Sequence, residues 1–251
     1  MPGARAVAEK TGAAVVKPAA AQPPASIPEY LSKNYWWAYL RPASLRIFDH
    51  KSVVSAILWG QYNGLVKAAL AEADQGAQVL QMACVYGDLS PRLAQKIGPG
   101  GALDIIDIAP IQVKNARHHL AGLPWAKARI GDAANPGAQK YDMVLSFFLL
   151  HELPENYKRA VVDSALSALK PGGKAVFVDY HRPARWHPLR PVQALVFALL
   201  EPFAKRLWRA ELAEFASHPG RYHWQKHTRF AGFFQITVAS SAPSDPGAKT
   251  V

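Results

Sequence analysis

Five short apolar stretches of the sequence each end in, or are followed by, acidic or histidine side chains. The first is followed by Asp88, the second ends in Asp107 and the third is followed by Asp132. Carboxylates accept hydrogen bonds from hydroxyl groups, and imidazoles move protons or bind metals. If the stretches are neighbouring parallel strands, their ends meet at one edge of a sheet, where ligands bind. The five segments are Cys84-Val85-Tyr86-Gly87-Asp88, Asp107-Ile108, Gly131-Asp132-Ala133, His151-Glu152 and Asp179-Tyr180-His181.

Each of these side chains also has a purely structural interpretation. Asp88 could cap the helix that follows it, and Asp132 could hold a turn. His151 could be a hydrogen-bonded core residue, and Glu152 could cap the next helix. Taken singly, neither interpretation has an advantage. The convergence of all these groups on one edge of a sheet favours a functional site.

The spacing of apolar residues predicts strands that alternate with helices. Turns rich in glycine and proline separate them, as in Lys170-Pro171-Gly172-Gly173. Strands joined through helices pair in parallel with right-handed crossovers, so the sequence predicts an α/β protein with a mostly parallel, doubly wound sheet. The expected strands are 79–84, 103–108, 128–130, 141–147 and 174–179, and the expected helices are 90–97, 110–120 and 155–169.

The segments around this core differ from it in composition. Residues 1–27, rich in Ala and Pro, are expected to be a disordered leader, with an organelle transit peptide as the minor alternative. Residues 28–75 have helical periodicity and predict an N-terminal helical cover. Residues 76–239 form the main domain, with a basic helical insertion at 182–220 before a terminal antiparallel hairpin. Residues 240–251 predict a disordered tail.

The overall composition excludes several classes of protein. Half of the 251 residues are apolar, which excludes disorder throughout, and the single Cys84 excludes a disulfide scaffold. The longest apolar stretch near the C-terminus, 192–200, is too short to cross a bilayer. The net charge is +11, and residues 181–229 contain nine basic and three acidic side chains. A basic segment with aromatic residues favours anionic lipid, RNA or an acidic partner, and composition does not choose among them.

Among these residues, Asp107 has the position that is easiest to interpret. It lies twenty residues beyond Gly87, at the end of the second strand, where a carboxylate can accept both ribose hydroxyls of an adenosine. Gly87 permits close backbone approach in the first turn, but the further glycines of a dinucleotide fingerprint are missing. A nucleoside without a pyrophosphate indicates S-adenosylmethionine rather than NAD. The alternative is that Asp107 only caps the end of a strand.

Three of these features together resemble the class I S-adenosylmethionine-dependent methyltransferases. They are Asp107, Gly131-Asp132 and the Leu169-Lys170-Pro171-Gly172-Gly173-Lys174 turn. The resemblance implies a Rossmann-like fold. The first turn departs from it, because Tyr86 and Asp88 stand where bare backbone usually receives the methionine carboxylate. The cofactor-binding residues implied are Val85, Tyr86, Gly87, Asp107, Ile108, Asp132 and Ala133.

That departure, with other segments, resembles a narrower family, the rhodoquinone biosynthesis enzymes. This resemblance implies conversion of ubiquinone to rhodoquinone, in which an amino group replaces a ring methoxy group. It also implies that S-adenosylmethionine supplies the nitrogen and that Mn²⁺ is required. The segments that carry the resemblance are 35–39, 57–60, 83–89, 147–152 and 178–188.

The chemistry implied by this resemblance makes demands that the candidate residues could meet. Exchange of methoxy for amine is an addition–elimination that builds charge on a ring carbonyl oxygen, which a divalent cation would stabilise. Tyr86 and Asp88 could turn the cofactor and accept the ammonium proton. The expected catalytic residues are Tyr86, Asp88, His151 and His181. The candidate manganese ligands are His151, Glu152, Asp179 and His181, with Asp88 and His187 in reserve. Of these, His151, Asp179 and His181 are the expected set.

A lipid-soluble substrate implies contact with a membrane. The aromatic segment 35–39 suits an interfacial lid, and 189–207 suits an amphipathic contact with an anionic membrane surface. The alternative for 189–207 is core packing beneath a solvated basic face. We expect ubiquinone as substrate, no nucleic acid, and a cytoplasmic location peripheral to the quinone-containing membrane (the mitochondrial matrix side if the leader is a transit peptide). The basic side chains involved are Arg182, Arg185, Arg190, Lys205, Arg206 and Arg209.

Two other functions are compatible with the sequence. One is ordinary methyl transfer to a quinone or a lipid, with the same cofactor and fold. The other is an RNA-binding module with a vestigial cofactor fold, which the net charge of +11 suggests. The oligomeric state has no signature in the sequence.

Overall fold

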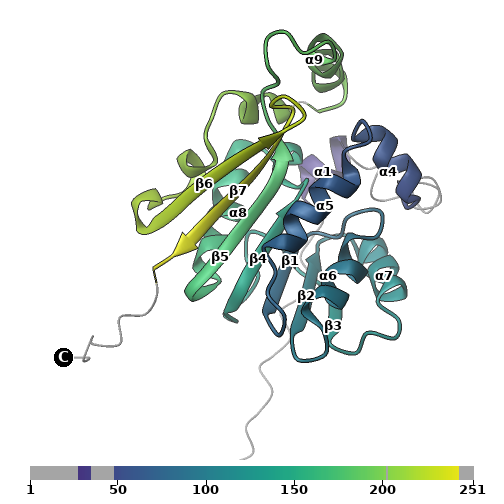
Figure 1. Ribbon diagram of the computed structural model, residues 1–251, viewed down its shortest axis with the longest axis vertical. Coiled ribbons are helices and arrows are strands. Elements are labelled where there is room, and N and C mark those ends of the chain that lie inside the picture. The colour runs from purple at the N-terminus through teal and green to yellow at the C-terminus, as the bar shows by residue number, and fades with distance from the viewer. Residues whose placement is uncertain (1–27, 35–47, 202, 243–251) are drawn as a thin grey trace, which may run out of the picture.

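A seven-stranded sheet forms the centre of the protein, with strand order β3-β2-β1-β4-β5-β7-β6 (Figure 1). The computed structural model describes residues 28–34, 48–201 and 203–242. The first five strands pair in parallel and the last two are antiparallel, which confirms the predicted Rossmann-like architecture with its C-terminal hairpin. The strands are β1 (Gln78–Met82), β2 (Ala102–Asp107), β3 (Ala126–Ile130), β4 (Tyr141–Phe147), β5 (Leu169–Tyr180), β6 (Tyr222–Arg229) and β7 (Phe234–Ser241).

Two apolar layers fix this sheet. Along β1, Val79 packs with one buried cluster and Leu80 with the other, because successive side chains of a strand point to opposite faces. A strand covered on both faces is apolar almost throughout, which is why the central strands were readable from the sequence. On one face lie α5 (Tyr62–Ala71), α6 (Leu89–Ile97) and α7 (Pro110–His119), and on the other lies α8 (Glu155–Ser167).

The strand order reverses between β1 and β4. The chain leaves these two neighbouring strands toward opposite sides of the sheet, so their carboxyl ends separate and open a crevice. The strand ends singled out in the sequence therefore lie at the edge of the sheet where a ligand site is expected.

The region after β5 contains less helix than the sequence predicted. A helix of ten residues, α9 (Arg190–Leu199), occupies only part of the helical insertion expected at 182–220. Pro202 follows Glu201, and a residue before proline is biased away from the helical conformation, which accounts for the early end. Short 3₁₀ turns follow: η2 (Ala204–Trp208), η3 (Leu212–Phe215) and η4 (Pro219–Arg221).

Three sequence predictions lie wholly or partly outside the described residues: the leader at 1–27, most of the tail at 240–251 and the aromatic segment at 35–39. Within residues 28–75, the described parts contain three helices. In the described residues, no helix has the length and apolar character that crossing a membrane requires. The three helices are α1 (Glu29–Asn34), α4 (Lys51–Ile57) and α5.

Candidate functional site

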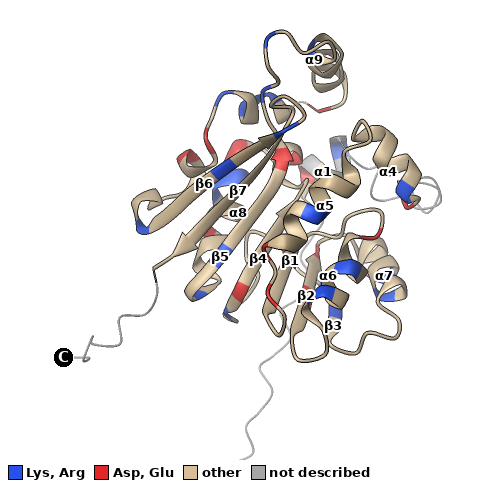
Figure 2. Cartoon of the chain, viewed as in Figure 1, with Lys and Arg blue, Asp and Glu red and all other residues tan. Residues whose placement is uncertain are grey.

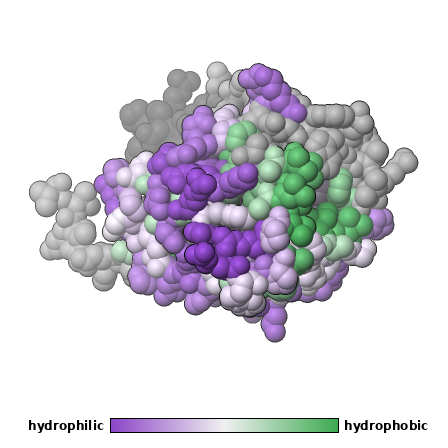
Figure 3. Space-filling model, turned by 90° about the horizontal axis from the view of Figure 1, so that it is seen from above, coloured by the Kyte–Doolittle hydropathy of each residue, from purple (hydrophilic) through white to green (hydrophobic). Residues whose placement is uncertain are grey.

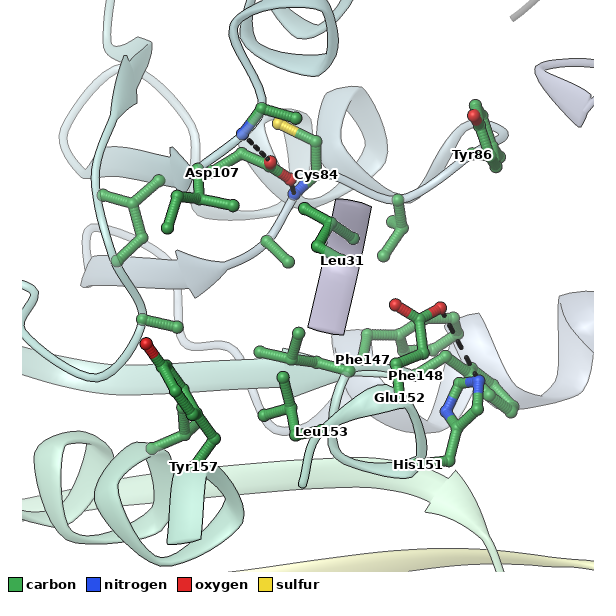
Figure 4. Close-up of a pocket in the computed structure, with 18 of the residues that line it drawn as sticks. Leu31, Cys84, Tyr86, Asp107, Phe147, Phe148, His151, Glu152, Leu153 and Tyr157 are labelled. Carbon is green, nitrogen blue, oxygen red and sulfur yellow. Dashed lines mark hydrogen bonds and ion pairs between the residues drawn. The ribbon is translucent and has the colours of Figure 1, made fainter. Parts of the chain in front are cut away.

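A cavity opens at the carboxyl ends of the parallel strands, beside the β1–β4 reversal. Each of the five strand ends predicted from the sequence contributes at least one residue to its lining. Figure 4 shows Asp107 and Cys84 on one side of the cavity, and Phe147, His151 and Glu152 on the other. The cavity therefore has a side built from the first three strand ends and an aromatic side built after β4.

Asp107 is held rigidly at the first side. Its two carboxylate oxygens accept hydrogen bonds from the backbone N–H groups of Cys84 at 2.7 Å and Ala109 at 2.8 Å. The carboxylate also lines the cavity, from which ribose hydroxyls can reach it. Its exposed surface belongs to the cavity rather than to bulk water, and this burial raises the pKa of Asp107 to about 6 against the opposing backbone hydrogen bonds.

Asp132 holds a turn and also lies at the cavity. Its Oδ1 accepts the backbone N–H of Ala134 at 2.8 Å, which is the turn-holding interaction of the structural alternative. Asp132 also lines the cavity. The other predicted cofactor-binding residues in the lining are Val85, Tyr86, Asp107, Ile108 and Ala133.

The first turn is closed by a tyrosine from α5. Gly87 has φ +91°, and a Cβ at this position would lie 2.6 Å from the hydroxyl oxygen of Tyr62. That hydroxyl donates to Asp88 Oδ1 at 3.0 Å and accepts the backbone N–H of Asp88 at 2.8 Å. Gly87 is thus required by the packing of Tyr62 and does not line the cavity among the described residues.

Tyr86 stands at the cavity with its phenol fixed. The side chain of Gln112 donates a hydrogen bond to its hydroxyl at 2.9 Å, and its ring lies 5.8 Å from that of Phe48. Burial raises the pKa of Tyr86 to about 12, so the phenol is neutral near pH 7. Tyr86 can orient a ligand or donate a hydrogen bond, but it is not a ready base.

Asp88 does not line the cavity among the described residues. Its carboxylate lies 3.0 Å from Lys51 Nζ and 3.5 Å from Arg92 Nη1. Partial burial opposes ionisation, but the hydrogen bonds from Lys51 and Tyr62 outweigh it and hold the pKa of Asp88 below its usual range. Asp88 occupies the N-cap position of α6 without a side-chain capping bond. The carboxylate of Asp88 is therefore paired with Lys51 and Arg92 and does not face the cavity.

His151 lies at the other side of the cavity, among three acidic residues. Its Nδ1 is 3.0 Å from Asp179 Oδ1, and its Nε2 is 3.7 Å from Glu152 Oε1. Burial alone would lower the pKa of His151, but the charges of Asp179, Glu201 and Glu152 raise it to about 9. The ring is therefore protonated near pH 7, and an imidazolium lines a cavity that is otherwise mostly apolar.

The predicted manganese ligands do not come together. Asp179 faces His151 and accepts the backbone N–H groups of His151 at 3.2 Å and Tyr180 at 2.7 Å. The ring of His181 instead lies 2.9 Å from the carbonyl oxygen of Gly232. Across the described ranges, no three His, Cys, Asp or Glu side chains are grouped so that they could hold a metal ion. The set His151, Asp179 and His181 therefore does not fit Mn²⁺.

Two lining residues have unusual backbone conformations. Ala83 follows β1 with φ +74°, and Phe148 follows β4 with φ +53°. The left-handed region costs free energy for residues other than glycine and is concentrated at functional sites. The strain thus lies at the two strands between which the order reverses.

The sequence did not reveal the aromatic side of the cavity. The apolar run after β4, Phe147-Phe148-Leu149-Leu150, was the available signal, since apolar residues beyond a strand end need something to cover them. Nothing marked Glu201, which reaches the cavity from the segment after α9. The lining residues missed are Leu31, Phe48, Val54, Ile57, Leu58, Ala83, Ile106, Ala109, Phe147, Phe148, Leu149, Leu153, Tyr157, Val161 and Glu201.

Comparison with known proteins identifies the type of domain. Residues 79–173 match the family described as a methyltransferase domain. The chain is 28% identical over 179 residues to a demethylmenaquinone methyltransferase of Desulfitobacterium hafniense, which covers 68% of this chain and 70% of that protein. It is 24% identical over 164 residues to an uncharacterized methyltransferase of Synechocystis, with 65% and 76% covered.

Solved structures share the fold. A TehB-like S-adenosylmethionine-dependent methyltransferase from Corynebacterium glutamicum has a TM-score of 0.52 and 18% identity, and covers 80% of this chain and 100% of its own. The mitomycin 7-O-methyltransferase has a TM-score of 0.62 and 17% identity, and covers 84% and 61%. These matches confirm the Rossmann-like class I methyltransferase fold.

The pKa of Asp107 predicts a pH-dependent affinity for S-adenosylmethionine. Below about pH 6 the carboxyl group is protonated and loses acceptor capacity, so affinity should rise as pH increases through this value. Asp107→Asn should weaken binding roughly ten- to hundredfold and abolish the pH dependence, because a charge-assisted hydrogen bond is worth about 1.5–3 kcal/mol. Calorimetric titration at several pH values measures both effects. Asp74→Asn, at an exposed carboxylate, is the control, and an unchanged affinity in Asp107→Asn would remove Asp107 from the site.

Gly87→Ala should distort the first turn. The new methyl group needs the φ of +91° and the space occupied by Tyr62, so the free energy of unfolding should fall by about 1–3 kcal/mol and cofactor affinity should fall with it. Urea denaturation and calorimetry measure the two quantities. Gly220→Ala, where no atom lies within 4 Å of the added Cβ, should change neither. Equal behaviour of the two variants would contradict the packing role of Gly87.

Proposed function

We propose that this chain, which matches a methyltransferase domain over residues 79–173, uses S-adenosylmethionine to modify a quinone ring, replacing a methoxy group of ubiquinone by an amino group. The observation that carries the proposal is the cavity at the strand ends, in which a carboxylate suited to ribose lies across from an aromatic wall containing a buried imidazole. One cavity can therefore hold the nucleoside of the cofactor and a flat, apolar ring together.

The choice of a quinone rests on the aromatic side. Phe147, Phe148 and Leu153 offer apolar surface to a ring, and His151 adds one polar group. A planar, apolar ring with carbonyl oxygens needs such a wall together with a hydrogen-bond donor. The relative from Desulfitobacterium is named for methyl transfer to demethylmenaquinone, which also supports a quinone.

The choice of amino transfer rests on the resemblance to the rhodoquinone biosynthesis enzymes and on the first turn. In this turn a side chain, Tyr86, faces the cavity where the methyltransferase pattern has bare backbone, and Gln112 holds its phenol in place. Bulk at this position favours a methionine portion turned away from its usual seat, with its nitrogen rather than its methyl group toward the quinone.

The first chemical step can be balanced with the groups available. The cofactor nitrogen, as a neutral amine, forms a bond to the ring carbon that bears the methoxy group, and negative charge develops on the conjugated carbonyl oxygen. His151, as an imidazolium oriented by Asp179, donates a hydrogen bond to that oxygen. The carbon–methoxy bond then breaks, and methanol leaves with the proton that the nitrogen loses. The bond between this nitrogen and the methionine carbon must be cleaved later.

The resemblance also implies a manganese requirement. Since the predicted ligand set does not assemble in the described residues, no step is assigned to a metal and the requirement stays a prediction. The residues assigned a role in the step are Asp107 for the nucleoside, Tyr86 for the methionine portion and His151 for the carbonyl oxygen.

Ordinary methyl transfer to a quinone is the second candidate. It is favoured by the curated relatives, which are named as methyltransferases. It uses the same cavity and the same Asp107, but requires the methyl group of the cofactor to face the acceptor. The two reactions differ in the atoms that reach the product.

Isotope labelling separates the two reactions. When ubiquinone is incubated with S-adenosylmethionine labelled separately in its amino nitrogen and in its methyl group, we expect the product to carry the labelled nitrogen, to lack the labelled methyl and to have lost mass. Mass spectrometry of the extracted quinone measures this, with S-adenosylhomocysteine added as a competitor to verify cofactor dependence. A heavier product carrying the methyl label would establish methyl transfer instead.

His151→Gln should lower kcat by roughly a hundredfold or more and leave the affinity for S-adenosylmethionine nearly unchanged, because His151 acts on the carbonyl oxygen and not on the nucleoside. Steady-state kinetics and calorimetry measure the two quantities. His223→Gln, on the exposed edge strand β6, is the matched control and should retain full activity. Full activity in His151→Gln would exclude the role assigned to this residue.

A further inference from the structure

Helix α9 exposes most of its large apolar side chains and buries a polar one. Val192, Leu195, Val196 and Leu199 follow helical spacing and so share one face, which we call the outward face. Leu195 is 59% exposed and Leu199 is 71% exposed, whereas Gln193 is buried. In a helix that packs on a water-soluble core, the apolar stripe faces inward. In α9 only Phe197 among the large apolar side chains faces inward, beside Gln193, and the other four face outward.

The orientation of Gln193 has a measurable cost. Both of its side-chain polar atoms are buried without a hydrogen-bond partner in the described structure. An orientation that buried the leucines and placed Gln193 in water would remove both costs, but it would also turn the buried Phe197 outward. The observed arrangement is therefore consistent with an outward face that is covered in use.

Exposed apolar surface continues beyond α9. Trp186, just before α9, is 76% exposed, and Ile57 and Trp59 at the end of α4 are also exposed. Figure 1 shows α9 and α4 at the same end of the molecule, and Figure 3, viewed toward that end, shows hydrophobic side chains gathered there beside hydrophilic ones.

This surface borders the cavity. Ile57 belongs both to the exposed apolar set and to the cavity lining, and Glu201, which lines the cavity, follows α9 directly. On its inner side, α9 places the ring of Phe197 5.1 Å from that of Tyr180, which is part of the cavity wall. The apolar surface and the site of chemistry thus share structural elements.

The charge around α9 is positive and largely uncompensated. Basic side chains precede and follow the helix, and Figure 2 shows blue segments in the neighbouring loops. Within the described ranges, five of them form no ion pair, and Arg206 alone is paired, with Glu155 and Glu214. Basic groups beside an apolar helix face complement anionic headgroups above acyl chains. The five are Arg182, Arg185, Arg190, Lys205 and Arg209.

We propose that the outward face of α9, with Trp186, Ile57 and Trp59, is a docking surface for an anionic membrane, and that it seats the cavity against the bilayer. Apolar side chains enter the headgroup region while the flanking arginines contact lipid phosphates. The inference deepens the proposed function, since it supplies the route by which a lipid-soluble quinone reaches the cavity without crossing water. The docking itself requires no quinone.

Vesicle binding by the full chain tests the surface directly. We expect the protein to co-sediment with vesicles of phosphatidylglycerol and phosphatidylcholine, and to bind pure phosphatidylcholine vesicles at least tenfold more weakly. Leu195→Ser with Leu199→Ser should weaken binding roughly tenfold or more. Arg185→Gln with Arg190→Gln should weaken it roughly fivefold per charge and flatten its salt dependence. Lys96→Gln with Lys127→Gln, exposed basic residues on other elements, is the matched control and should bind as the unaltered chain does.

Three outcomes would overturn the proposal. They are absence of binding by the unaltered chain, undiminished binding by both α9 variants, and conversion of a dimer to a monomer by the leucine variant at constant vesicle affinity. The last result would assign the face to a second copy of the chain. Unchanged affinity for S-adenosylmethionine in solution shows that each variant is folded.

Failure of docking is distinguishable from failure of the proposed function. A water-soluble, short-tailed ubiquinone should be turned over equally by the unaltered chain and by the leucine variant, whereas long-tailed ubiquinone in vesicles should be turned over only by the former. Vesicle binding without any quinone product would support the docking surface and contradict the proposed quinone reaction. Equal turnover of vesicle-borne ubiquinone by both proteins would contradict the docking surface but not the proposed quinone reaction.

Discussion

The site depends on the carboxylate of Asp107. By accepting the backbone N–H groups of Cys84 and Ala109, it joins the turn after β1, the end of β2 and the start of α7 in one rigid unit. Those two hydrogen bonds offset part of the desolvation cost of a carboxylate at this depth, and they prevent it from rotating. A group fixed in this way can bind the paired hydroxyls of a ribose without first losing conformational freedom.

On the opposite side of the cavity, a buried imidazolium is balanced by nearby carboxylates. Three carboxylates surround His151 in a region of low dielectric, so the imidazolium and the acids stabilise one another. Lys158, almost fully buried, adds a second cation nearby and donates hydrogen bonds to the carbonyl oxygens of Leu153 and Phe203, which ties the turn after β4 to the segment after α9. Because Glu201 belongs to this cluster and also follows α9, the proposed docking surface and the proposed chemistry share one wall.

The sequence predicted the elements whose side chains are controlled by burial alone. The central strands are buried on both faces, so they were readable as apolar runs, and the edge where ligands bind followed from their parallel order. The predictions from sequence were wrong where the direction of a side chain determines whether it reaches the site. At the end of β5, Asp179, Tyr180 and His181 alternate between the faces of the sheet, and Tyr180 is the one that lines the cavity. Proximity in sequence therefore selected Asp179 and His181 as metal ligands although neither reaches the cavity lining in the described residues. For α9 the sequence left membrane contact and core packing as alternatives, since the periodicity defines a face without saying where it points.

The central claim is that one cavity holds the nucleoside of the cofactor and the quinone ring at the same time. A crystal structure of the protein with S-adenosylhomocysteine and a short-tailed ubiquinone tests it most directly. The account predicts ribose hydroxyls within hydrogen-bond distance of Asp107 and a quinone carbonyl oxygen on His151, with the ring against Phe148. A nucleoside bound away from Asp107, or a quinone bound outside the cavity, would contradict it.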